Sequence, residues 1–397
     1  MNDYSSHRFF ADNEPTSQKI LFGNGSRKKV VEFAKELGSR ILLVTDCGLT
    51  SVGHPQEIML LLEGAGLKVT LYDKSVENPT EKSVESCAQV AKEANIDLII
   101  GLGGGSSMDT AKGCNFILTN GGRMSDYWGV GKATSEMLPF IAIPTTAGTG
   151  SECQSFALIS QDETNKKMAC GDTKALPAVT ILDPYLTLSQ PFSVTACTGI
   201  DAMAHALESA VTTKRNEFSH RHAKIAFDLI NSSLPLVLQK PDDLESRGKV
   251  LLGASHAGAA IEQSMLGAAH SVANPLTAAK KVVHGIAVGL ALPKVMQINS
   301  TLPEVKNIYS EFSRDCGLAS PNSSNEEATE ILIKHVLKII SFADLPSSLD
   351  ELGFSRSDIP DLSSNAAEQW TARFNPKTLL LEDFENIYES LFAHISC

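Results

Sequence analysis

The stretch DLIIGLGGGSSMDTAKG (residues 97–113) decides the fold of this chain. It begins with a short apolar run typical of a buried strand, passes through consecutive glycines and ends in a helix-like segment. Glycines directly after a strand let the backbone approach a ligand closely, and the amides that open the following helix favour a negatively charged group such as a diphosphate. The stretch lacks the Gly-x-Gly-x-x-Gly pattern, so a purely structural tight turn is the alternative.

A second loop strengthens the nucleotide-binding interpretation. The segment LPFIAIPTTAGTGSE (138–152) is predicted to be a strand that opens into a loop of hydroxyl side chains and glycines. Ligands of parallel α/β sheets bind at the carboxyl ends of the strands, so both loops are expected at the same edge of the sheet. The residues that the two loops offer to a dinucleotide are Gly103, Gly104, Gly105, Ser106, Asp109, Thr145, Thr146 and Thr149, with Ser151 as a further hydroxyl donor.

Asp46 ends the first predicted strand of the sheet. A carboxylate at this place can accept hydrogen bonds from ribose hydroxyls, and it would repel an additional 2′-phosphate. A helix N-cap is the structural alternative, because carboxylates are common at that position.

Strands and helices alternate through the first half of the chain. The other predicted strands lie at 40–46, 67–73 and 178–184, and the predicted helices at 54–66 and 80–96. This alternation predicts an α/β dinucleotide-binding domain, residues 1–186, with a parallel sheet and helices on both faces. Strand patterns disappear further along, so residues 187–397 are predicted to form an all-α domain. This domain contains the candidate metal ligands described below, and we therefore expect it to be the metal-binding domain.

Composition restricts the class of protein. A chain of 397 residues is long enough for two domains, and its net charge of −12 argues against nucleic acid or an anionic membrane as a partner. None of the 8 cysteines forms a Cys-x-x-Cys pair, which suits reduced thiols in a cytoplasm. No apolar run approaches the roughly 20 residues of a membrane helix, and we find no secretory signal at the N-terminus. We therefore expect a soluble cytoplasmic protein.

The segment TGIDAMAHALES (198–209) pairs a carboxylate with an imidazole. Asp201 and His205 are four residues apart, so both side chains lie on one face of a helix. An ordinary surface pair is the alternative, but the flanking residues are small or apolar, and an Asp and a His on a buried helix need a compensating partner. His270 and His284, in AAHSVANPLTAAKKVVHG (268–285), are the natural companions. One carboxylate and three imidazoles would suit Fe²⁺ or Zn²⁺ with an open position for substrate.

The other histidines receive structural interpretations. His220 and His222 flank Arg221 at what we expect to be a solvated helix start, whereas His256 lies in a segment with a buried pattern and is left undecided. The remaining ones are expected in polar stretches or on amphipathic helices: His7, His54, His335 and His394.

Taken in order, these segments resemble the iron-containing (group III) alcohol dehydrogenases, which have the dehydroquinate synthase-like fold. Further segments carry the resemblance over nearly the whole chain: KILFGNGS (19–26), LDPYLTLSQP (182–191), HGIAVGLALP (284–293) and NPKTLLLEDFENI (375–387). The resemblance implies a metal-dependent oxidoreductase that transfers a hydride between NAD(H) and a small polar alcohol or aldehyde. In the implied mechanism the metal binds the alcohol oxygen, lowers its pKa, and the alkoxide passes hydride to the nicotinamide. We also expect a homodimer.

The resemblance also implies roles by motif position. The metal ligands would be Asp201, His205, His270 and His284. The diphosphate would lie on Gly104, Gly105 and Ser106, with Thr145, Thr146 and Thr149 along the adenine and ribose. Lys167, in KKMACGD, matches a lysine that approaches the nicotinamide-side ribose. An aspartate at the position of Asp46 implies NAD rather than NADP.

Three features depart from the family pattern. Asn274 replaces a histidine that follows the third ligand and is thought to relay protons; an asparagine cannot act as a general base, so the proton must leave through water, a ribose hydroxyl or another group. Ile261 and Gln263 stand where the family often has Phe and Asn. Lys280 and Lys281 replace an aromatic residue and a proline: facing the cleft they would imply an acidic or phosphorylated substrate, and the alternative is that both are solvated.

Two other functions compete with the dehydrogenase. A dehydroquinate-synthase-like enzyme would act on a phosphorylated or acidic sugar-derived substrate, but it needs several basic residues and a different ligand set. A non-catalytic scaffold would have no need to retain all four ligands together with the glycine loop.

Overall fold

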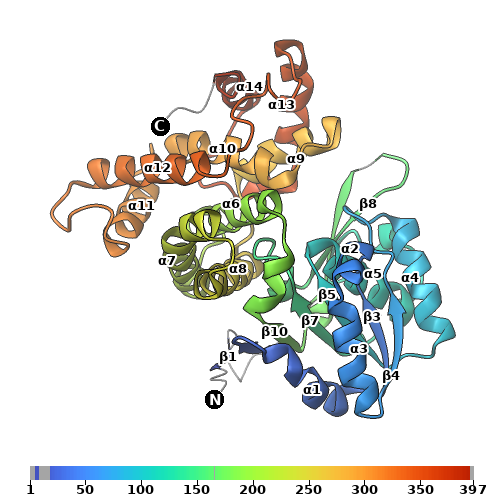
Figure 1. Ribbon diagram of the computed structural model, residues 1–397. Coiled ribbons are helices and arrows are strands. Elements are labelled where there is room, and N and C mark those ends of the chain that lie inside the picture. Colours follow the sequence, from blue (N-terminus) through green and yellow to red (C-terminus); the bar gives the residue numbers. More distant parts are fainter. Residues whose placement is uncertain (1–4, 9–17, 165, 394–397) are drawn as a thin grey trace. The chain divides into compact units, whose positions relative to one another are not determined.

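The computed structural model describes residues 5–8, 18–164 and 166–393, with side chains from residue 18 onward. It consists of two compact units, the N-terminal unit Met1–Gln190 and the C-terminal unit Pro191–Cys397 (Figure 1). The division lies after Gln190, close to the predicted boundary at residue 186. The interpretations of the side chains of His7 and His394 fall outside the described residues.

The N-terminal unit is built on a 7-stranded sheet with the order β1-β2-β10-β7-β5-β3-β4. Its strands are β1 (Ser5–Arg8), β2 (Lys19–Phe22), β3 (Arg40–Val44), β4 (Lys68–Tyr72), β5 (Leu98–Gly103), β7 (Phe140–Pro144) and β10 (Val179–Leu182). All neighbouring strands are parallel except the pair β1 and β2, which is antiparallel. The predicted parallel sheet is confirmed, and β2 and its antiparallel neighbour extend it beyond the prediction.

Helices cover both faces of this sheet (Figure 1). The helices of the N-terminal unit are α1 (Val30–Leu37), α2 (Cys47–Val52), α3 (His54–Gly64), α4 (Glu81–Glu93) and α5 (Gly105–Asn120), with 3-10 turns η1 (Ser26–Lys29), η2 (Met124–Tyr127), η3 (Ser151–Cys153), η4 (Thr173–Ala175) and η5 (Pro184–Ser189). Along β3, Ile41 and Leu43 belong to one core cluster with residues of α1 and α3, whereas Leu42 and Val44 belong to another with residues of α4 and α5. Burial on both faces explains why the strand is an unbroken apolar run in the sequence.

A second, 3-stranded sheet of the same unit was not predicted. It has the order β6-β9-β8 and consists of β6 (Gly129–Val130), β8 (Phe156–Ser160) and β9 (Lys167–Gly171), with β8 and β9 antiparallel. β6 has 2 residues, and β9, with the sequence KMACG, contains no β-branched or aromatic residue, so neither carries a strand signature.

The C-terminal unit is helical, and no strand occurs among its described residues, 191–393, as predicted. Its helices are α6 (Phe192–Ser209), α7 (Glu217–Gln239), α8 (Leu244–Ser264), α9 (Ala268–Lys280), α10 (His284–Asn299), α11 (Pro303–Asp315), α12 (Asn325–Ser341), α13 (Ile359–Ala367) and α14 (Leu381–Ser390), with turns η6 (Arg356–Asp358) and η7 (Trp370–Phe374). Helix α6 is buried at every residue from Gly199 to Ser209. Its polar side chains in this stretch therefore face other parts of the fold rather than water. Within the described residues, no helix is long and apolar enough to cross a membrane.

Candidate active site

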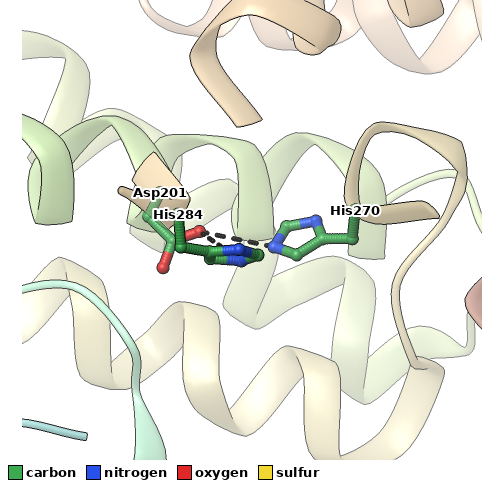
Figure 2. A group of neighbouring side chains, drawn as sticks. All are labelled: Asp201, His270 and His284. Carbon is green, nitrogen blue, oxygen red and sulfur yellow. Dashed lines mark ion pairs between the residues drawn. The ribbon is translucent and has the colours of Figure 1, made fainter. Parts of the chain in front are cut away.

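Three helices of the C-terminal unit bring four predicted ligands together. Asp201 and His205 lie one turn apart on α6, His270 lies in the first turn of α9, and His284 begins α10. The Nε2 atoms of His205, His270 and His284 lie 3.3, 3.3 and 3.7 Å from the same oxygen, Asp201 Oδ1. Figure 2 shows the imidazoles of His270 and His284 turned toward this carboxylate. The arrangement surrounds one carboxylate oxygen with three imidazole nitrogens.

The atoms of this cluster fit a divalent cation. Asp201 Oδ1 and His270 Nε2 are buried and make no hydrogen bond to any described residue, although they face each other. Buried polar atoms are normally hydrogen-bonded, whereas ligand atoms that share a cation have no need to bond to one another. One ligand atom each from Asp201, His270 and His284 lies within 4.8 Å of the others. Carboxylate oxygen and imidazole nitrogen are ligands for both Fe²⁺ and Zn²⁺.

Protons carry the positive charge of the cluster in the metal-free protein. Burial raises the pKa of Asp201, but the three imidazoles, His205 first, outweigh burial and hold this pKa well below its usual value. Burial lowers the pKa of His270, but the neighbouring carboxylates of Asp201 and Glu208 raise it overall to about 9. An ionised carboxylate therefore pairs with a protonated imidazole near neutral pH, and a bound cation would replace that proton.

Glu208 is a site residue that the sequence reasoning missed. It lies on α6 and is 3% exposed, and its Oε2 accepts a hydrogen bond from His270 Nδ1 at 2.5 Å. Ligating histidines commonly donate their second ring N–H to a carboxylate. The spacing 201, 205, 208 places all three side chains on one helix face, so the signal was present in the sequence.

Asn274 lies one turn beyond His270 on α9 and is half-buried. Its Nδ2 donates a hydrogen bond to Gln369 Oε1 at 3.0 Å. Because Gln369 is also an amide, this pair contains no group that takes up a proton near neutral pH.

The two lysines that depart from the family pattern lie at the end of α9 and are exposed. Lys280 Nζ is 3.5 Å from Asp358 Oδ2 and lies over the ring of Phe354, 4.4 Å from its centroid. Lys281 is the exposed C-cap of the helix, with φ of 56°. The structure favours the solvated interpretation of both lysines.

The interpretation of His222 as solvated was wrong. The residue is 3% exposed, and His222 Nδ1 lies 2.9 Å from His256 Nδ1 in a hydrogen bond that joins α7 to α8. Phe218 stacks on the same ring at 4.2 Å between centroids. Burial lowers the pKa of His222 to about 4, with a further contribution from Arg221. The neighbouring Arg221 suggested a solvated face, but one turn of helix carries both exposed and buried positions.

In the N-terminal unit the two predicted loops are in contact. A Cβ atom on Gly104 would lie 3.1 Å from Thr146 Cγ2, and one on Gly105 would lie 2.8 Å from Thr149 Cγ2. Gly103 has φ of +151°, a conformation that favours glycine. The N-cap of α5 is Gly104, which has no side chain to bond the first amides of the helix. These amides are of the kind that bind phosphate groups in other proteins.

The N-cap interpretation of Asp46 is confirmed, whereas its contact with a ribose stays a prediction. It is the N-cap of α2, where its Oδ1 accepts a hydrogen bond from Leu49 N at 3.0 Å. Its Oδ2 accepts one from Ser107 Oγ at 3.4 Å, which places the carboxylate beside the glycine turn.

Asp109 and Lys112 lie in the interior beneath the two loops. Ser151 Oγ donates to Asp109 Oδ1 at 3.0 Å, and Lys112 Nζ donates to Ser151 O at 2.6 Å and to Ser151 Oγ at 2.9 Å. Lys167, at the start of β9, lies close enough for its charge to act on Asp109. The contacts of Asp109 thus fasten α5 to the second loop.

Replacing Asp109 by asparagine is expected to change how stability depends on pH. Burial raises the pKa of Asp109 to about 6, despite the opposing effects of Lys112 and Ser151. Because this pKa is higher in the folded state, the protonated carboxyl stabilises the fold below about pH 4, and up to about 3 kcal/mol is lost as the pH rises through 6. The free energy of unfolding of Asp109→Asn should therefore rise relative to that of the parent between pH 4 and pH 7. Urea unfolding at several pH values measures this, and a constant difference would contradict it.

Comparisons with known proteins agree with this architecture. Residues 17–184 match the family "Iron-containing alcohol dehydrogenase", and residues 195–392 match the family "Fe-containing alcohol dehydrogenase family, C-terminal". Alcohol dehydrogenase 4 of Saccharomyces cerevisiae (strain YJM789) is 32% identical over 375 residues, which cover 94% of this chain and 97% of the yeast protein. The NAD-dependent methanol dehydrogenase of Bacillus methanolicus is 32% identical over 371 residues, 93% of this chain and 97% of that protein.

A solved structure shows the same fold. The crystal structure of a 1,3-propanediol oxidoreductase superimposes with a TM-score of 0.91 at 28% sequence identity, covering 99% of this chain and 100% of the other. None of these relatives favours the dehydroquinate-synthase alternative. With two family matches that together span most of its length, the chain belongs to the iron-containing alcohol dehydrogenase family.

Proposed function

We propose that this oxidoreductase transfers a hydride between NAD(H) and a small polar alcohol or aldehyde, with Fe²⁺ or Zn²⁺ bound by Asp201, His205, His270 and His284. The observation that carries the proposal is the convergence of three imidazole Nε2 atoms on one buried oxygen of Asp201. A divalent cation bound there would supply Lewis acidity toward the alcohol or carbonyl oxygen.

The ligand side chains differ in their access to solvent, which supports an open position for substrate. The side chains of Asp201, His205 and His270 are between 5% and 7% exposed, whereas that of His284 is 30% exposed. Substrate would approach beside His284, and the other ligands would stay shielded from water. One carboxylate and three neutral imidazoles give the occupied site a net charge of +1, which favours a developing alkoxide.

In the N-terminal unit, the glycine turn and the second loop are proposed to bind NAD. The amides of Gly104, Gly105 and Ser106 would bind the diphosphate at the start of α5. The hydroxyls of Thr145, Thr146 and Thr149 would line the adenine and ribose, together with Lys167 at the nicotinamide-side ribose. Asp46 would accept a ribose hydroxyl and disfavour the 2′-phosphate of NADP, which supports a preference for NAD.

Asn274 is proposed to orient water or a substrate hydroxyl, because Gln369 fixes its amide and neither residue can accept the released proton. The proton would then leave through water. A homodimer, a location in the cytoplasm and the division of roles between residues 1–186 and 187–397 stay predictions.

Chelation and metal restoration test the proposed function. Dialysis of the full chain against a chelator is expected to abolish NAD-linked oxidation of small alcohols, and anaerobic addition of Fe²⁺ or Zn²⁺ should restore it. Parallel assays with NAD and NADP, over a panel of short-chain alcohols and diols, test the cofactor and the substrate class. Full activity in protein shown to be free of metal would contradict the metal site, and equal rates with NADP would contradict the role of Asp46.

A further inference from the structure

Both carboxylate oxygens of Glu208 are bonded to the beginning of α9. Oε2 accepts from His270 Nδ1 at 2.5 Å, and Oε1 accepts from the backbone amide of Ala269 at 2.7 Å. The carboxylate therefore connects α6, which carries Asp201 and His205, to the ring of His270 and to the backbone amide of the residue before it. Its two bonds fix the ring of His270 relative to the helix that bears the other two ligands.

A second polar side chain binds the same helix end without touching His270. The N-cap of α9 is Gly267, which has no capping side chain, and Asn375 Oδ1 accepts from the neighbouring amide of Ala268 at 3.2 Å. Asn375 and Asn299 exchange two amide hydrogen bonds, of 2.8 and 2.9 Å. Asn375 begins the segment NPKTLLLEDFENI, which carries part of the family resemblance and has no part in the proposed reaction.

Because Gly267 has no side chain, the oxygens of both Asn375 and Glu208 can approach the start of α9. A Cβ atom at this position would lie 3.0 Å from both Asn375 Oδ1 and Glu208 Oε1. Both oxygens thus accept from backbone amides at the same helix terminus, but only Glu208 also bonds the ring of His270. This difference separates the contribution of Glu208 to the helix end from its contribution to the metal site.

We propose that Glu208 is a positioning residue: by accepting the Nδ1–H of His270 it fixes the tautomer and ring orientation that direct Nε2 toward Asp201, and it thereby tightens binding of the divalent cation. The inference rests on the proposed metal site. The negative charge on Glu208 also increases the basicity of the imidazole toward a cation. Asn375 stabilises the same end of α9 through the backbone alone.

Two variants distinguish positioning from simple capping. Glu208→Gln keeps the size of the side chain but removes its charge, and its single oxygen can accept from only one of the two donors. Asn375→Ala removes the neighbouring cap and leaves His270 untouched. For each full-length variant and the parent, Zn²⁺ affinity is measured by competition with a chelator, and the melting temperature of the metal-free protein is measured by circular dichroism.

Both variants are expected to melt below the parent, but only Glu208→Gln should bind Zn²⁺ more weakly, by about 10- to 100-fold. Asn375→Ala should stay within about threefold of the parent. If Glu208→Gln does not fold, Glu208→Asp replaces it: its carboxylate is too short to reach both donors, and the same loss of affinity is expected.

Zn²⁺ affinity of Glu208→Gln equal to that of the parent, or an equal loss in both variants, would overturn the inference, because Glu208 would then only cap α9. If the parent itself takes up neither Zn²⁺ nor anaerobically added Fe²⁺, the proposed metal site fails, and this inference fails with it. Metal uptake by the parent therefore distinguishes a failure of the proposed metal site from a failure of the role proposed for Glu208.

Discussion

Asp201→Ala is expected to lose its stoichiometric metal and to reduce kcat/KM for alcohol oxidation by at least about 1,000-fold, the several kcal/mol that a catalytic metal contributes. The carboxylate supplies the one negative charge within a group of three imidazoles, all within 3.7 Å of Asp201 Oδ1. Without it, the site loses the ligand oxygen toward which the three Nε2 atoms converge, and a bound cation would lose the negative charge that offsets part of its own. Metal analysis of the purified protein and steady-state kinetics with NAD measure the two effects.

The matched control is Asp361→Ala, which removes an exposed carboxylate from α13 in the same unit. It should retain both the metal and the activity of the parent. An Asp201→Ala protein that keeps one metal ion per chain would show that the ligand assignment is wrong, whatever its activity.

Gly285→Ala is expected to destabilise the fold strongly and to weaken metal binding, through packing alone. Gly285 follows His284 at the start of α10, and a Cβ atom there would lie 2.1 Å from the carbonyl oxygen of Cys197 on α6. The obstructing atoms belong to the backbone, so α10 must move away from α6, and His284 moves with it. We expect the free energy of unfolding to fall by about 3 kcal/mol and the metal affinity to fall as well.

Gly289→Ala, one turn further along α10, is the control for this substitution. Its Cβ atom would lie 3.1 Å from Ile200 Cγ2, a side-chain atom that can shift. Thermal unfolding and metal analysis of both variants compare backbone obstruction with side-chain crowding. Similar results for the two variants would mean that the approach of α10 to α6 does not determine the position of His284.

The fold was largely predictable where burial leaves a strong pattern. Strands such as β3 and β5 have both faces covered by helices, so their apolar runs are continuous, and the glycines after β5 mark the turn into α5. The second sheet was not predicted, because β6 has 2 residues and β9 contains no β-branched or aromatic residue. The six-residue helix α2 was not predicted either, because it has no buried residues and therefore no apolar face.

The site was predictable in part. Asp201 and His205 follow from helical spacing, but spacing does not show that α9 and α10 bring His270 and His284 to the same carboxylate. That convergence depends on tertiary packing, including the contact at Gly285, and the resemblance to a family supplied it instead. Glu208 had the right spacing, but a buried glutamate beside a serine at a helix end has no motif of its own. His222 was misjudged because adjacent residues of a helix face different sides: Arg221 is exposed, whereas His222 is buried.

The origin of the ligands on three separate helices has a consequence for the lifetime of the protein in a cell. Asp201, His270 and His284 are brought together only when α6, α9 and α10 have packed, so a cation at the proposed site would bind the folded chain in preference to the unfolded one. Such binding adds about 2.7 kcal/mol of stability when the free metal is 100-fold above its dissociation constant. The metal-free chain is then the form most often unfolded and most open to proteases. Metal scarcity would lower the amount of this enzyme as well as its turnover.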